Sequence, residues 1–221
     1  ITPASNPRQP AWTAAIIPES GLHKRTGRQS AVITAHTTPF TALKLPSATF
    51  APPISASTRS WLTHLWMRQK AKSKLPTWFN TLGIVYAPKL NLEQTSSELT
   101  AAYKQELIQG KTLADITGGF GVDSYFFAQR FEQVHHFEIQ QHLCDVVTHN
   151  LKHLPNKSFK SQLKDGLKAI ENKTFDVIYA DPSRRHDSKG KVFFLEDCEP
   201  NIPKNLDYLL QRCTTLLVKT S

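Results

Sequence analysis

After Gly110, apolar runs of β type alternate regularly with helix-type patterns, and this alternation limits the folds that are open to the chain. Alternating β and α units build a parallel sheet with helices on both faces. The sequence therefore predicts a doubly wound α/β domain over residues 111–221. The expected strands are Thr112–Ile116, Gln133–Glu138, Phe159–Leu163, Phe175–Ala180 and Thr214–Val218, and the expected helices are 122–131, 140–151 and 166–170.

Residues 61–110 predict a small helical N-terminal subdomain. Apolar residues recur at helical spacing from Trp61 and stop at Pro76, and a second helix is expected over Leu99–Ile108. Cap chemistry precedes this second helix at 95–98, and Gly110 closes it. A short strand is expected between the two helices, at Gly83–Ala87.

Residues 1–60 have a different composition. They hold 8 of the 14 prolines and six basic residues against one acid, a net charge of +5. Prolines at this density leave few windows for a helix or a central strand, and the segment can bury little apolar surface. We therefore expect a disordered tail. Its role stays open between a transit-like leader, a basic arm that grips RNA and a linker without selected structure.

Charge and cysteine usage narrow the class of protein. Lys and Arg number 27 against 18 Asp and Glu, a net charge of +9, which favours a polyanionic partner. No apolar run reaches the roughly 18 residues that a membrane-spanning helix needs. Cys144, Cys198 and Cys213 form neither an even disulfide framework nor a CxxC metal pattern, which favours a reducing, cytoplasmic location.

A glycine loop follows the first expected strand, in the segment Asp115-Ile-Thr-Gly-Gly-Phe-Gly-Val-Asp123. The dinucleotide fingerprint needs a third glycine, which is absent, and the P-loop needs Gly-Lys-Ser/Thr, which is also absent. A carboxylate at Asp115 would repel a pyrophosphate, but it suits a ligand with an ammonium group and hydroxyls. S-adenosylmethionine is such a ligand.

Acidic residues at the ends of the next two expected strands could also bind S-adenosylmethionine. Glu138 ends the second strand, where an acid can accept hydrogen bonds from both ribose hydroxyls. Asp165 follows the third strand, where an acid can accept from the exocyclic amine of adenine. Each acid alone could be a solvated loop carboxylate. Together with the loop they predict a cofactor site, because the carboxyl ends of parallel strands share one rim.

The fourth expected strand ends in Asp181-Pro182-Ser183-Arg184-Arg185. Amino-group methyltransferases place an acid there, followed by prolines and an aromatic residue. The acid and a main-chain carbonyl accept from the target amine. Here Asp181 and Pro182 keep the acceptors, but no aromatic residue follows. Arg184 and Arg185 could clamp a phosphate or an acidic substrate, or could pair with acids such as Asp187 or Glu196.

The remaining histidines, cysteines and lysines give weaker indications of function. His149 and His153 are four residues apart, but no acid or cysteine at matching spacing completes a metal site, so we expect no metal. Cys198 lies 17 residues beyond Asp181, too far for a nucleophile at that strand end. A stripe of lysines could face phosphates or solvent: Lys152, Lys157, Lys160, Lys164, Lys168 and Lys173.

From about Trp61 to its end, the chain resembles bacterial class I S-adenosylmethionine-dependent methyltransferases with a C-terminal THUMP-like domain. The motifs that carry the resemblance include 74–78, 92–98 with Thr100 and Tyr103-Lys104, 115–123, 137–138, 149–150, 181–185, 197–201 and 217–221. A weaker likeness links the Asp115 and Asp181 motifs to rRNA guanine-N2 methyltransferases.

The resemblance implies a Rossmann-like methyltransferase fold that stops here after its fifth strand, without the THUMP-like domain in which target recognition would largely reside. It implies cofactor contacts at Asp115, Thr117, Gly119, Gly121, Glu138, Asp165 and Asp181, with the segment from Gln94 to Glu98 over the methionine end. The expected activity is methyl transfer to RNA, at a base amine of tRNA or rRNA. Two alternatives remain: a non-catalytic RNA-binding module with a vestigial cofactor fold, and a small-molecule or protein methyltransferase. The oligomeric state stays open.

Overall fold

The structure is a computed structural model that describes residues 13–18, 56–155, 159–186, 190–191 and 194–220. Its helices are α1 (Ala56–Lys74), α2 (Pro76–Asn80), α3 (Lys89–Gln94), α4 (Glu98–Glu106), α5 (Val122–Phe127), α6 (Gln141–Asn150), α7 (Gly166–Ala169) and α8 (Leu206–Leu210). Its strands are β1 (Thr13–Pro18), β2 (Thr112–Asp115), β3 (Gln133–Glu138), β4 (Phe159–Leu163), β5 (Phe175–Ala180), β6 (Arg185–His186), β7 (Gly190–Lys191) and β8 (Cys213–Thr220).

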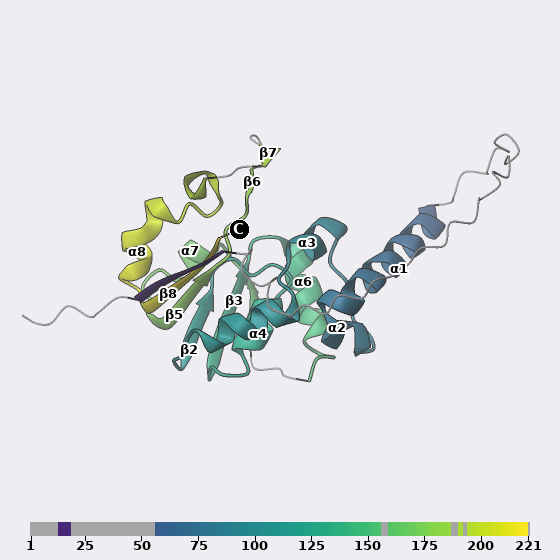
Figure 1. Ribbon diagram of the computed structural model, residues 1–221, viewed down its shortest axis with the longest axis horizontal. Helices are drawn as coiled ribbons and strands as arrows, with labels where there is room; N and C mark the ends of the chain where they lie inside the picture. The colour runs from purple at the N-terminus through teal and green to yellow at the C-terminus, as the bar shows by residue number, and fades with distance from the viewer. Residues whose placement is uncertain (1–12, 19–55, 156–158, 187–189, 192–193, 221) are drawn as a thin grey trace, which may run out of the picture.

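The five strands predicted from the sequence lie side by side in the order β8-β5-β2-β3-β4, and all are parallel (Figure 1). The chain moves outward from β2 through β3 to β4, then returns to the other side of β2 at β5. The order of the strands therefore reverses between the neighbouring strands β2 and β5. Open α/β sheets bind ligands at such a reversal, outside the carboxyl ends of the strands.

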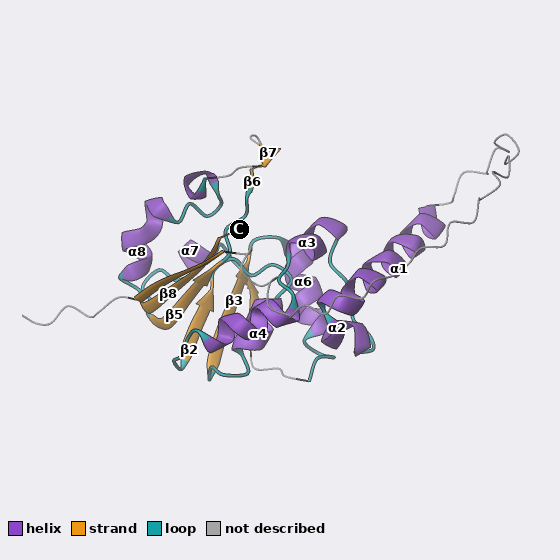
Figure 2. Cartoon of the chain, viewed as in Figure 1, coloured by secondary structure: helices purple, strands orange, loops and turns teal. Residues whose placement is uncertain are grey.

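Helices cover both faces of the sheet (Figure 2). Alternate strand residues feed two separate cores: Leu113 and Val177 pack with the helices α1 to α6, whereas Ala114 and Ile178 pack with α7 and α8. The doubly wound α/β fold is therefore confirmed. The bounds of β3, β4 and β5 equal the predicted ones. Strand β5 is buried over nearly its whole length, as expected between two helical layers, whereas β4 lies at the edge of the sheet and fully buries only Phe159.

One predicted strand is wrong. Residues 83–87 form no strand: Gly83 lies in a turn, and residues 84–87 have no regular secondary structure. The backbone of Val85 instead pairs with a side chain of α6: its N–H donates to Oδ1 of Asn150 at 2.9 Å, and its carbonyl accepts from Nδ2 at 2.8 Å. A side-chain amide thus replaces the neighbouring strand, and an apolar run alone cannot distinguish the two.

Residues 1–60, predicted to be disordered, contain two described stretches that differ from that expectation. Strand β1 lies parallel to β8 at the edge of the sheet, with Thr13 opposite Thr215 and Pro18 opposite Thr220. Helix α1 already begins at Ala56. Residues 1–12 and 19–55 lie outside the described part of the chain.

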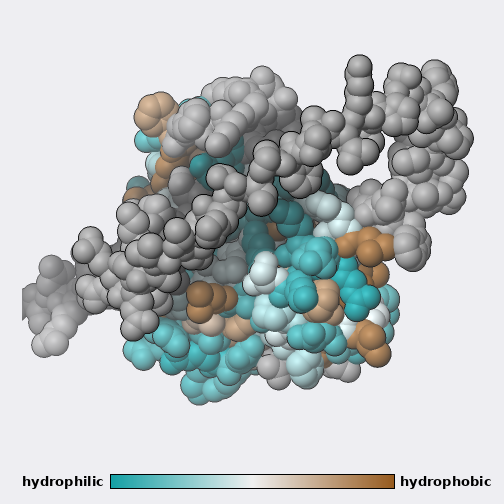
Figure 3. All heavy atoms as spheres, turned by 45° about the vertical axis from the view of Figure 1, so that its right-hand side comes forward, coloured by the Kyte–Doolittle hydropathy of each residue, from teal (hydrophilic) through white to brown (hydrophobic). Residues whose placement is uncertain are grey.

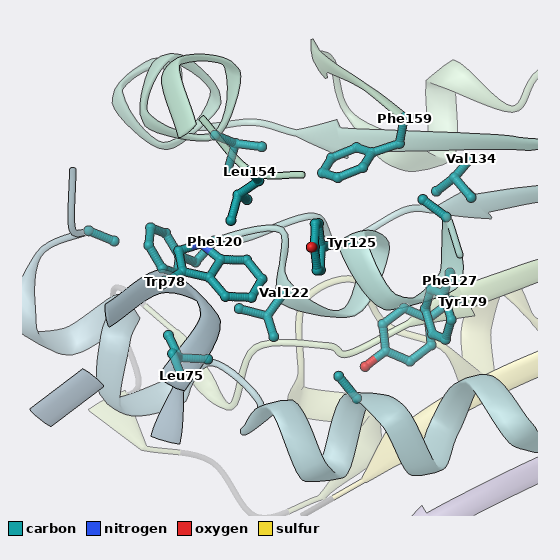
Figure 4. Packing of buried hydrophobic residues seen from close by; sticks show 14 of the residues in the cluster. Leu75, Trp78, Phe120, Val122, Tyr125, Phe127, Val134, Leu154, Phe159 and Tyr179 are labelled. Atoms are coloured by element: carbon teal, nitrogen blue, oxygen red, sulfur yellow. The ribbon is translucent and has the colours of Figure 1, made fainter. Parts of the chain in front are cut away.

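The helical unit before the sheet packs on the face that carries α5 and α6. The Trp78 ring of α2 lies 5.0 Å from the ring of Tyr125 and 6.3 Å from that of Phe120, centroid to centroid (Figure 4). Within the unit, the Glu98 carboxylate accepts from the backbone N–H and the hydroxyl of Thr77, at 2.6 and 2.8 Å. Ser97 caps α4 by accepting from the N–H of Thr100, as the cap pattern predicts. These contacts fix the loop between α3 and α4 against the sheet.

Candidate functional site

A cavity of about 300 Å³ opens where β2, β3 and β5 end. The glycine loop, the strand ends and the loop between α3 and α4 all contribute to its wall. The lining residues used below are Gln94, Ser96, Asp115, Thr117, Gly119, Asp123, Glu138, Tyr179, Asp181, Pro182, Arg184 and Lys219. The cavity therefore lies at the reversal of strand order, with the helical unit forming one of its sides.

Asp115 ends β2 and is almost fully buried at the base of this cavity. Its Oδ2 accepts from the Ser124 hydroxyl at 2.7 Å, and its Oδ1 accepts from the backbone N–H of Thr117 at 3.1 Å. Burial nevertheless raises the pKa of Asp115 to about 7, and the nearby Asp123 adds to the rise. Burial thus destabilises the ionised form of Asp115, and a cationic ligand beside the carboxylate would stabilise that form.

Glu138 ends β3 and is fixed by backbone donors. The N–H of Gly119 donates to its Oε2 and the N–H of Gln140 to its Oε1, both at 2.7 Å. The glycine loop can turn toward Glu138 because Gly119 and Gly121 have φ values of +63° and +76°, which favour glycine. Burial raises the pKa of Glu138 despite these bonds.

Asp181 directly follows β5 and faces a partner that sequence reasoning missed. Its Oδ2 accepts from Nζ of Lys219, a buried lysine of β8, at 2.8 Å. Its N–H donates to the Thr117 hydroxyl at 2.7 Å, which ties this loop to the one after β2. Burial raises the pKa of Asp181, and the charge of Lys219 opposes that rise. The next residues are held in place too, since Ser183 and Glu199 exchange backbone hydrogen bonds.

A buried ionic network lies beside Asp115, and sequence reasoning missed it as well. Lys104 of α4 has no exposed surface, and its Nζ lies 2.6 Å from Oδ1 of Asp123. The same Nζ donates to the hydroxyl oxygens of Ser96 and Tyr179 at 2.8 and 2.7 Å, and both hydroxyls donate to Oδ2 of Asp123 at 2.9 Å.

The network joins three elements of the chain, since Lys104 lies on α4, Asp123 on α5 and Tyr179 on β5. Burial acts to raise the pKa of Asp123, but Lys104 outweighs it, so this pKa lies below its ordinary value. The available signal was a lysine three residues after Ala101, on the buried face of α4. Helical spacing indicates that this lysine is buried, but it does not indicate which acidic residue it pairs with.

The structure brings most of the predicted site residues together. The cavity is lined by Gln94, Asp115, Thr117, Gly119, Glu138, Asp181, Pro182 and Arg184. Two predicted residues lie outside this lining. Gly121 is the residue before α5, and Asp165 is exposed and caps α7 by accepting from the N–H groups of Leu167 and Lys168. Arg185 lies on the short strand β6, but its side chain, like Asp187, lies outside the described part of the chain.

Neither a metal-binding cluster nor a membrane-spanning helix occurs among the described residues. Their His, Cys, Asp and Glu side chains form no cluster of three that could hold a metal ion. No helix among them combines the length and apolar character needed to cross a membrane.

No protein-family model matches the chain, and no curated protein matches it significantly. Among solved structures, the chain is similar to a protein from Porphyromonas gingivalis W83 that is provisionally described as a methyltransferase. The two are 28% identical with a TM-score of 0.61, and the match covers 76% of this chain and 42% of that one. A protein from Pyrococcus horikoshii, provisionally described as an RNA methyltransferase, is 22% identical with a TM-score of 0.43, over 68% of this chain and 74% of its own.

A third similar structure is a protein from Streptococcus mutans in complex with S-adenosylhomocysteine, also provisionally described as a methyltransferase. It is 17% identical with a TM-score of 0.39, over 52% of this chain and 65% of that one. The Porphyromonas gingivalis comparison shows that the chain has the Rossmann-like fold of that protein. The chain spans less than half the length of that protein.

Proposed function

We propose that the cavity binds S-adenosylmethionine and that the chain is part of a methyltransferase acting on RNA at a base amine. One observation carries the proposal: Asp115 and Glu138, at the ends of adjacent strands, line one cavity at the reversal of the sheet. The likeness to the Porphyromonas gingivalis protein supports it at the level of the fold.

The residues present fit the charge and the donors of this cofactor. Its ammonium group would stabilise the carboxylate of Asp115, whose pKa is raised to about 7 by burial. Its ribose hydroxyls would donate to Glu138, because a carboxylate has about four acceptor sites and the two backbone N–H groups leave capacity. Gln94, Thr117 and Gly119 would complete the walls around the methionine end.

The adenine contact is proposed at Asp165, which follows β4, the strand beside β3. Asp165 lies outside the lining and its Oδ1 already caps α7, so the proposed contact uses the remaining acceptor capacity of its carboxylate. Gly121 is assigned to shaping the glycine loop at the start of α5.

The acceptor amine is proposed to donate hydrogen bonds to the Asp181 carboxylate and the Pro182 carbonyl. Arg184, and with it Arg185, would hold a phosphate or another acidic group of the substrate. When bound, the cofactor would supply an electrophilic methyl group and would retain the S–C electron pair. Asp181 and Pro182 would orient the amine so that its lone pair could form the N–C bond, and the displaced amine proton would pass to solvent. The chain's own contribution is positioning, which can supply about 7–11 kcal/mol of the barrier.

Calorimetric titration of S-adenosylhomocysteine into the 221-residue chain tests the cofactor. We expect micromolar binding that Asp115→Asn weakens at least tenfold, while the matched change at an exposed aspartate of α8, Asp207→Asn, leaves it unchanged. A folded chain that does not bind the ligand contradicts the cofactor assignment. That result, combined with salt-dependent RNA binding, would favour the vestigial RNA-binding module.

Transfer of a labelled methyl group to total bacterial RNA tests the acceptor. Asp181→Ala should abolish transfer while S-adenosylhomocysteine still binds, because Asp181 is assigned to the acceptor. Undiminished transfer would remove Asp181 from the proposed chemistry. Methylation of a small molecule or a protein that excess RNA does not inhibit would favour the third class of function.

A further inference from the structure

Residues 20–92 contain no Asp or Glu, although they contain ten Lys or Arg residues. Within the described part of this stretch, from Leu65 onward, the cations are Arg68, Lys70, Lys72, Lys74 and Lys89. A run of one charge sign in a folded unit creates a positive potential that attracts polyanions. The question is which of these cations are available, and where they lie relative to the cavity.

The packing of α1 decides which cations face solvent. Met67 and Ala71 of α1, and Leu75 directly after it, are buried at a spacing of four residues, so the second half of α1, from Leu65 on, lies on the body along one narrow stripe. Lys70 lies on one flank of that stripe and is exposed. Lys74 has a structural role instead, because its Nζ donates to the carbonyls of Leu92 and Glu93 at 3.2 and 2.8 Å. The space-filling view brings this side forward and shows hydrophilic surface interspersed with hydrophobic groups on its described part (Figure 3), and the exposed large hydrophobic residues of this unit include Leu65, Leu82 and Leu90.

Two lysines from different elements meet at one aromatic ring. Nζ of Lys70 lies 5.5 Å from the Trp66 ring centroid, and Nζ of Lys89 lies 4.8 Å from it. Cation–π attraction of this kind contributes about 0.5–1 kcal/mol at exposed sites and keeps the two ammonium groups near the same place. Glu93 lies 3.9 Å from Lys89, but both side chains are exposed, so this pair neutralises Lys89 weakly.

This Trp66 face, defined as Trp66, Lys70 and Lys89, adjoins the cavity through α3. Lys89 begins α3, and Asn91, Glu93 and Gln94 of the same helix line the cavity. At about 1.5 Å per residue, Lys89 and Gln94 are separated by roughly 7.5 Å along the helix axis. A strand bound at the Trp66 face would therefore reach the cavity within a few nucleotides.

We propose that the Trp66 face binds the phosphate backbone of the substrate RNA and leads the strand to the cavity. This inference rests on the proposed function, and it assigns to this chain its own RNA contact surface. An anionic membrane is the less suitable polyanion. A helix that lies on a membrane buries an apolar face in it, whereas the stripe of Met67, Ala71 and Leu75 is already buried against the body.

The test compares two double variants of the 221-residue chain in binding to total bacterial tRNA at several salt concentrations. Lys70→Gln with Lys89→Gln should weaken binding roughly tenfold and lower the salt slope by about 1.4, at ~0.7 for each lost single-strand contact. Lys168→Gln with Lys173→Gln removes the same charge from exposed positions of the lysine stripe and should change neither. The affinity of both variants for S-adenosylhomocysteine should equal that of the unaltered chain.

Each other outcome has a defined meaning. Equal losses in both double variants would show that net charge alone attracts the RNA, and they would overturn the proposed surface. Unchanged tRNA binding by the Lys70/Lys89 variant would overturn it while leaving the proposed function intact. If the unaltered chain binds S-adenosylhomocysteine but no tRNA, the RNA part of the proposed function fails together with the surface. Tighter binding to phosphatidylserine vesicles than to tRNA, lost in the same variant, would assign the face to a membrane and overturn the proposal.

Discussion

At the scale of single residues, the cavity depends on the protonation of Asp115. Its folded-state pKa is raised from 3.8 to about 7 by burial, so the free protein loses stability as pH rises through this range and the carboxyl ionises. A ligand ammonium beside the carboxylate reverses the preference. The dissociation constant of S-adenosylhomocysteine should therefore rise by up to about tenfold for each pH unit below 7, measured by calorimetry.

The control for this pH dependence is Asp115→Asn, which keeps the shape of the side chain and removes the proton. This variant should bind weakly, with an affinity that no longer changes around pH 7. Glu138 also has a raised pKa, so a smaller slope can remain at lower pH in both proteins. An equally steep slope around pH 7 in Asp115→Asn would refute the assignment of the ammonium to Asp115.

Lys104 provides a second test at the residue scale. Replacing it with methionine leaves Asp123 buried without its cation, which should lower the free energy of unfolding by about 3–5 kcal/mol in urea titrations. Lys104→Met with Asp123→Asn should be less destabilised than Lys104→Met alone, because the uncompensated charge is gone. Lys72→Met, at an exposed position, should stay within about 0.5 kcal/mol. Strict additivity in the double variant would contradict a coupled pair.

The same residues show how far a site can be predicted from sequence. Asp115, Glu138 and Asp181 are predictable because each stands at the carboxyl end of an expected strand, and parallel strands bring these ends to one rim. Lys104 and Lys219 were not assigned roles, because their partners lie 19 and 38 residues away on other elements. Asp165 follows the same rule as the other acids, yet it lies outside the lining, because the local cap of α7 orients its side chain.

At the scale of elements, the segment 83–87 depends on α6. Asn150→Ala removes both hydrogen bonds to Val85, and we expect a loss of about 1–3 kcal/mol in the free energy of unfolding, with faster hydrogen exchange at the Val85 amide. Asn150→Asp keeps the acceptor for that amide and should retain most of its protection. Equal exchange rates in Asn150→Ala and the unaltered chain would show that the segment is held by other contacts.

Predictions of whole elements succeeded where burial alone defines the pattern. Strand β5 fits this best, because it lies between two helical layers and is buried at five of its six residues. Strand β3 is buried at four of six residues, and β4, at the edge of the sheet, at one of five. Segment 83–87 carries the same local signal but pairs with the side chain of Asn150, 65 residues away in sequence from Val85. Strand β1 lies among prolines that argue against structure, and its pairing with the distant β8 has no local signature.

At the scale of the whole molecule, the cavity joins the helical unit to the sheet. Gln94 ends α3 and Ser96 lies in the loop between α3 and α4, whereas Thr117 and Gly119 come from the loop after β2. Lys104 links the two sides through Ser96 and Asp123. A ligand that contacts both loops stabilises both against local opening. At about 100 times its dissociation constant, S-adenosylhomocysteine should add about 2.7 kcal/mol to the free energy of unfolding.

Hydrogen exchange can show whether this stabilisation is shared. We expect the ligand to slow exchange in residues 94–97 and in residues 117–121 together, because Ser96 is held by Lys104 in the same network that borders the glycine loop. In Lys104→Met with Asp123→Asn, protection of 117–121 should persist while that of 94–97 falls, since the link between the loops is cut. If residues 94–97 exchange at the same rate with and without ligand in the unaltered chain, the helical unit does not take part in binding, and the cavity belongs to the sheet alone.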